Sequence, residues 1–99
     1  MIIAWLDRDN TIDIMLSDNG VPIDHSLITR ILLVFNALTI DSVTSASLFD
    51  LTGQDKIVFK PGASTTLVPG SFNMRIVTYD QLNTDGVVWG DEHILIMQG

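Results

Sequence analysis

Hydrophobic and polar residues alternate along several short runs of the chain, which is the pattern of strands with one buried face. The runs are Thr11–Ser17, Lys56–Lys60 and Ser71–Tyr79, and Met15 is the one apolar residue on the polar face of the first run. The predicted buried faces are Ile12, Ile14 and Leu16; Ile57 and Phe59; and Phe72, Met74 and Ile76. The pattern therefore predicts half-buried β-strands in these three places.

The last run, His93–Gln98, is apolar on both faces. Ile94 and Ile96 lie on one face, and Leu95 and Met97 lie on the other. Strands covered on both sides show such continuous apolar sequence. We expect the second cover to come from the domain itself or from another subunit.

Turn-forming residues separate the runs at short intervals, and they favour an all-β sandwich or barrel. The turns are predicted at Asp7–Asn10, Ser17–Gly20, Thr52–Asp55, Pro61-Gly62, Pro69-Gly70 and Asn83–Gly86. The 99 residues show no repeat and no linker, so a single domain over residues 1–99 is expected.

The segment Ser26–Leu38 fits two patterns. Apolar residues at helical spacing, with Ser26 as a possible N-cap, favour a helix (Leu27, Ile31, Phe35 and Leu38). The density of β-branched residues and the turn-like Asp41-Ser42 favour a strand. We predict a strand.

Charge and cysteine content narrow the function classes. The chain has 5 Lys and Arg against 12 Asp and Glu, a formal net charge of −7, and its basic residues are scattered. Direct nucleic-acid binding needs clustered cations and is disfavoured. No cysteine is present, which excludes disulfides, thiolate metal sites and a cysteine nucleophile. No signal peptide or membrane-spanning segment is expected.

The sequence offers no convincing catalytic, cofactor or metal site. Asp7–Asn10 begins like a calcium loop, but Ile12 and Asp18 occupy the places of the required glycine and glutamate. In Asp91-Glu92-His93, an extended chain would point at most two ligands to one side, and His25 is far away in sequence. No Gly-x-Ser-x-Gly motif exists. We predict no catalytic residue, no cofactor and no metal.

The two tryptophans are candidates for either the core or an interface. Core packing is the simpler interpretation of Trp89, which lies in a predicted short strand hinged by Gly86 and Gly90. Trp5 is the stronger interface anchor, because an N-terminal strand is often an edge strand. The interface candidates are Ile3, Trp5, Trp89, Leu95 and Met97.

The order of turns and strands resembles a family of virion proteins. The segments that carry the likeness are Asp9–Thr11, Asn19–Asp24, Ile28–Leu33 with Thr39–Ser42, Leu67–Phe72, Arg75–Asp80 and Gly86–Gly90. They resemble small immunoglobulin-like virion proteins of tailed bacteriophages, similar in plan to the N-terminal domain of upper baseplate proteins and to tail-fibre-associated modules. The resemblance implies an immunoglobulin-like β-sandwich of about seven to eight antiparallel strands. It also implies a non-catalytic structural role in the virion, assembled in the host cytoplasm, and transfers no functional residue.

Three functions remain open from the sequence. The first is a phage structural protein that docks virion components in the tail, baseplate or fibre-attachment region, as a homo-oligomer or ring, or else decorates the capsid or neck. The second is a small acidic inhibitor of a host protein, such as an anti-CRISPR protein or DNA mimic, which would cluster its carboxylates on one face. The third is a sugar-binding or hydrolytic module, which would need an exposed aromatic platform or two facing carboxylates.

Overall fold

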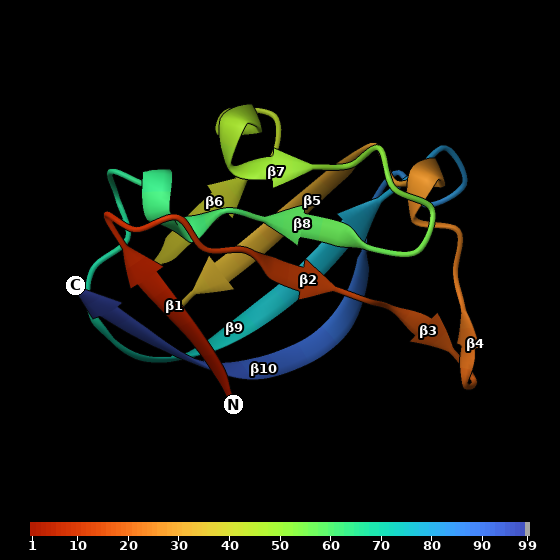
Figure 1. Ribbon diagram of the computed structural model, residues 1–99. Coiled ribbons are helices and arrows are strands. Elements are labelled where there is room, and N and C mark those ends of the chain that lie inside the picture. The colour runs from red at the N-terminus through yellow and green to blue at the C-terminus, as the bar shows by residue number, and fades with distance from the viewer. Residues whose placement is uncertain (99) are drawn as a thin grey trace.

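The protein is an all-β sandwich, as the alternating pattern predicts. The computed structural model describes residues 1–98, and Figure 1 shows a larger and a smaller sheet. The larger sheet has five strands in the order β1-β10-β9-β5-β6: Ile2–Leu6, Val87–Gln98, Gly70–Tyr79, Arg30–Phe35 and Leu38–Asp41. The smaller sheet has three strands in the order β2-β8-β7: Ile12–Ile14, Ile57–Phe59 and Phe49–Asp50.

Short elements lie in the connections between the strands of the two sheets. Strands β3 (Ser17–Asp18) and β4 (Val21–Pro22) form a two-stranded hairpin. Three 3-10 helices lie in connections: η1 (His25–Leu27), η2 (Ala46–Leu48) and η3 (Pro61–Ala63). No helix within residues 1–98 is long and apolar enough to cross a membrane.

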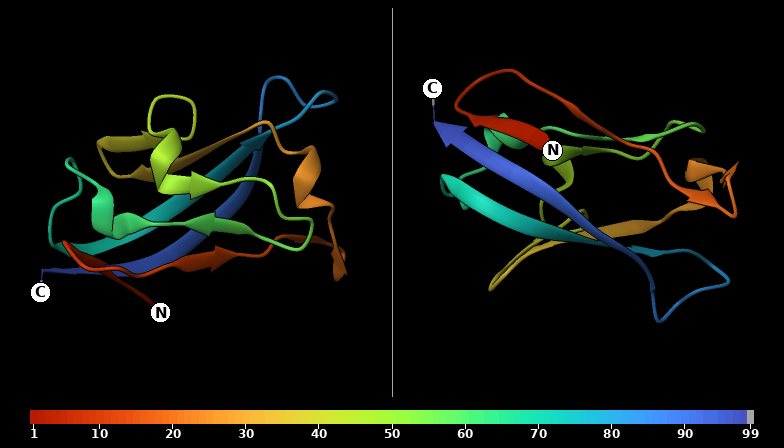
Figure 2. Two further views of the ribbon diagram at one scale, coloured as in Figure 1. Left: turned by 45° about the horizontal axis from the view of Figure 1, so that its top comes forward. Right: turned by 90° about the horizontal axis from the view of Figure 1, so that it is seen from below.

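The core lies between the two sheets, which Figure 2 shows from two further sides. The isoleucines, leucines and phenylalanines at alternate positions meet there, and the fully buried large side chains include Phe35, Phe59 and Ile57. The Phe49 and Phe59 rings stack with centroids 5.2 Å apart. The three alternating runs therefore turn the predicted face toward the core, with Phe72 half-buried at its margin.

One strand pair differs from the expected antiparallel arrangement. β1 runs parallel to β10, with Ile2 opposite Ile94, and the other pairs are antiparallel. β1 lies at the edge of its sheet, as expected for the N-terminal strand. The parallel pair places the first and last strands side by side (Figure 2).

The segment predicted as one strand, Ser26–Leu38, contains a helical turn and two strands. Residues 25–27 form η1, whose N-cap is Asp24 rather than Ser26. β5 then ends at Phe35, and β6 begins at Leu38. Asn36 adopts a positive φ of 55° between them, and this tight turn carries neither glycine nor proline that would mark it in the sequence.

The segment Gly86–Gly90 is not a separate short strand. Val87 begins the long strand β10, and a bulge between Val88 and Gly90 shifts its register against β9. Gly90 has a φ of 111°, a conformation that favours glycine at a bulge.

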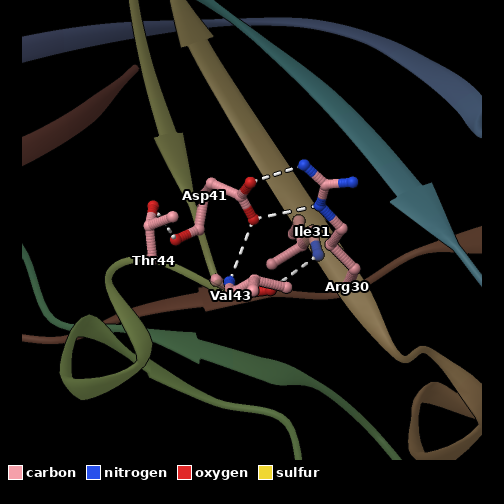
Figure 3. A network of polar contacts seen from close by, with 6 residues as sticks. Arg30, Ile31, Asp41, Val43 and Thr44 are labelled. Carbon is pink, nitrogen blue, oxygen red and sulfur yellow. Dashed lines mark hydrogen bonds and ion pairs between the residues drawn. The ribbon is translucent and has the colours of Figure 1, made fainter.

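A polar network fixes β5 against β6 and the turn that follows (Figure 3). The Arg30 guanidinium donates two hydrogen bonds to the Asp41 carboxylate, whose Oδ1 also accepts the Val43 amide at 2.9 Å. The Ile31 amide donates to Ser42 Oγ at 2.9 Å. The hydrogen bonds from Arg30, and secondarily from Val43, lower the pKa of Asp41. Together with the Ile31–Ser42 bond they connect β5 to the end of β6 and the turn after it.

His25 is a fully buried connector between three segments. The Leu16 amide donates to its Nε2 at 2.8 Å, so Nδ1 carries the proton and donates to the Gln54 carbonyl at 3.0 Å. The His25 amide donates to that same carbonyl at 2.8 Å. One imidazole thus joins the β2–β3 connection to the β7–β8 connection.

Candidate docking surface

Four of the five predicted interface residues lie together on the outer face of the larger sheet. Ile3 is directly opposite Leu95, and Trp5 is directly opposite Met97. Their neighbours in the same strands, such as Ala4 and Ile96, are buried in the core, so alternation turns these four outward. We call Ile3, Trp5, Leu95 and Met97 the strip.

The strip remains substantially open to solvent. Ile3 is 51% exposed and Trp5 is 39% exposed, while Leu95 and Met97 are half-buried. The core covers the inner face of the last strand. Within residues 1–98, no element of the domain covers its outer face, so the alternative of cover by another subunit stays a prediction. A contiguous apolar patch of this kind is a feature of protein-interaction surfaces.

Polar residues border the strip on the same sheet face. Ser71, opposite Leu95, shares a 2.9 Å hydrogen bond with His93 Nε2. Farther along, Arg75 Nε lies 3.1 Å from the Asp91 carboxylate. An apolar centre with a polar rim is the usual anatomy of a protein interface.

The free edge of β1 beside the strip is blocked by a side chain. The Trp5 amide donates to Asn10 Oδ1 at 3.1 Å, and Asn10 Nδ2 donates to the Trp5 carbonyl at 2.7 Å. Asn10 thus occupies both backbone groups that a neighbouring strand would use there. This geometry favours contact through the face of the sheet over pairing of a further strand at Trp5.

Trp89 lies apart from the strip. It is partly buried against the core, and its Nε1 donates to Thr78 Oγ1 at 2.7 Å. Its packing accords with the core interpretation, because the indole N–H is satisfied inside the domain. We therefore leave Trp89 out of the docking surface.

The polar residues that we considered as ligands do not converge. His25 is buried and fully bonded, whereas His93 lies on the outer sheet face beside Ser71. Asp7 accepts a hydrogen bond from Gln98 Nε2 at 2.9 Å. Among residues 1–98, no group of three metal-ligating side chains is found.

Three aspartates accept hydrogen bonds from residues of their own loops, and these bonds lower their pKa values. Ser26 donates to Asp24, Thr52 donates to Asp50, and Asn83 donates to Asp80. Such local bonds fix loop conformation.

The geometry of the strip was only partly accessible from the sequence. The strip residues were identified, but their pairing across β1 and β10 depends on a contact between the two ends of the chain. The role of Asn10 was missed. Comparison of the sequence with models of known protein families gives no match, and no curated protein matches it.

Proposed function

We propose that this chain is a non-catalytic structural protein of a tailed-phage particle, which docks virion components in the tail, baseplate or fibre-attachment region. It would act inside the virion as a homo-oligomer or ring. The immunoglobulin-like plan and the phage origin rest on the sequence resemblance stated above.

The observation that supports docking is the strip on the outer sheet face. The exposed parts of its four side chains do not stabilise the isolated domain. If a partner covered them, removal of this apolar surface from water would stabilise the complex. Trp5 has the largest side chain of the set, and buried tryptophans dominate interface energetics.

The shape of the domain also suits docking. The domain measures 38 × 23 × 22 Å, and its β1 edge is blocked at Trp5. A rigid face can be repeated around a ring axis, with each contact burying roughly 1,000 Å² or more.

Sedimentation velocity over a range of concentrations, together with analysis of purified particles, tests this proposal. Trp5→Ser should weaken assembly by at least about tenfold, since loss of roughly 1.4 kcal/mol per contact has that effect. Its melting temperature should stay close to that of the wild type, because Trp5 is outside the core.

Val43→Ser is the matched control for this experiment. Val43 is 65% exposed, and it follows β6 at the sheet edge opposite β1. This variant should assemble normally. A wild-type protein that is monomeric at all concentrations and absent from particles would contradict the proposal, as would equal assembly by Trp5→Ser.

A further inference from the structure

A second apolar surface lies at the end of the sandwich where η1 and the β9–β10 connection meet. A groove of about 470 Å³ opens there, lined by Ser26, Leu27, Thr29, Asp80, Gln81 and Leu82. The Thr29 amide and hydroxyl both donate to the Tyr79 carbonyl, at 2.9 and 3.2 Å, and join the two walls. Both elements occupy the same end of the molecule in Figures 1 and 2.

Two leucines stand on opposite walls of this groove. Leu82 is 94% exposed and Leu27 is 65% exposed. Neither contributes much to the core, so the fold itself does not explain an apolar side chain at these positions. Single exposed leucines are common on protein surfaces, but these two line the same groove, so one partner side chain could cover both.

Hydrogen bonds hold the backbone of both walls before any partner binds. The Asp80 carboxylate accepts the Leu82 amide at 2.9 Å and the Asn83 amide at 2.8 Å. On the other wall, Asp24 accepts the Ser26 amide at 3.0 Å and caps η1. Walls that are already ordered lose less conformational entropy when a partner binds.

The rim of the groove is acidic. Hydrogen bonds, chiefly from Asn83 and Ser26, lower the pKa values of Asp80 and Asp24, so both carboxylates are ionised at neutral pH. The groove lining contains no Lys or Arg, and the nearby Arg30 guanidinium is bonded to Asp41. Charge complementarity therefore favours a cationic partner.

We propose that this groove docks a partner protein through an apolar side chain flanked by Lys or Arg. The apolar side chain lies between Leu27 and Leu82. The cations face Asp80, which lines the groove, and Asp24, which lies outside the lining but is hydrogen-bonded to the lining residue Ser26. The aliphatic stems of Lys and Arg add contact with the leucines while their charged ends remain at the carboxylates. This site is separate from the strip, and it stands whether or not the strip mediates virion assembly.

Backbone amide shifts of the isotope-labelled protein test the proposal with two synthetic peptides. One is acetyl-Gly-Lys-Leu-Trp-Lys-Gly-amide, and the other has glutamate in place of both lysines. The lysine peptide should give saturable shifts at residues 26–29 and 80–82, and the glutamate peptide should bind at least about tenfold more weakly. Leu82→Ser and Leu27→Ser should each weaken the lysine peptide by about tenfold, as expected for one lost leucine contact.

Two control variants separate this site from the rest of the surface. Val68→Ser changes another exposed residue, 57% exposed in the β8–β9 connection, and should bind the peptide like the wild type. Trp5→Ser should also bind normally, even if it fails to assemble.

Three results of the peptide experiments would overturn the inference. They are the absence of saturable shifts at the groove, equal binding of the two peptides, and unchanged binding by Leu82→Ser. Groove shifts that depend on protein concentration without peptide would instead identify a second copy of this chain as the occupant, and would also overturn it.

Discussion

Replacing His25 with phenylalanine should destabilise the fold although it keeps a ring of similar size in the core. The substitution removes the acceptor of the buried Leu16 amide and the donor to the Gln54 carbonyl. An unsatisfied buried amide costs about 1–3 kcal/mol. The Gln54 carbonyl keeps its hydrogen bond from the His25 main-chain amide at 2.8 Å. Loss of the second hydrogen bond, from the imidazole, therefore adds about 1 kcal/mol or less.

Urea unfolding followed by tryptophan fluorescence measures this change. The free energy of unfolding should fall by about 1–4 kcal/mol at an unchanged m-value. His25→Ala should cost more, because it also removes packed volume from a site that is 0% exposed.

The second histidine provides the matched control. His93 is exposed on the outer sheet face and bonded to Ser71, so His93→Phe should remain within about 0.5 kcal/mol of the wild type. A His25→Phe protein as stable as His93→Phe would refute the assignment of His25 as a connector.

Three further predictions concern stability. A Cβ at Gly62 would lie 1.8 Å from the Arg8 carbonyl oxygen, so Gly62→Ala should cost about 1–3 kcal/mol by urea unfolding, and an unchanged midpoint would contradict this. Ile76→Ala truncates a buried side chain and should cost about 2–5 kcal/mol, while its folded fraction still assembles; assembly loss without destabilisation would count against a core role. The Arg30 hydrogen bond lowers the pKa of Asp41 from 3.8, so its stabilisation is complete above that pH and is lost as pH falls through the folded-state pKa. Asp41→Asn should therefore lose less stability than the wild type during acid titration, and identical profiles would refute this.

The sequence predicts the strand faces well because alternation is a local signal. Ile57 and Phe59, like Met74 and Ile76, point into the core as their spacing requires. The turn at Asn36 was missed because a single asparagine in a left-handed conformation leaves little trace in a run of apolar residues.

Contacts between distant segments could not be predicted from the sequence. β1 pairs with β10 at the other end of the chain, and Leu27 meets the loop of Leu82 only after folding. The role of His25 as a connector could not be predicted either, because its hydrogen bonds to distant backbone groups form only in the folded chain. The sequence did contain one indication of an ordered loop around Leu82. Aspartate side chains commonly accept hydrogen bonds from the backbone amides two or three residues later, as Asp80 does here.

The blocked edge of β1 has a consequence for how the protein tolerates change. A single amide side chain supplies both the donor and the acceptor that cover Trp5, so protection depends on one residue having both groups. Aspartate at position 10 would lack the donor, and lysine would lack the acceptor. Either replacement would leave one backbone group of a strand edge free to pair with a strand of another chain, so the identity of residue 10 helps to keep contacts on the face of the sheet.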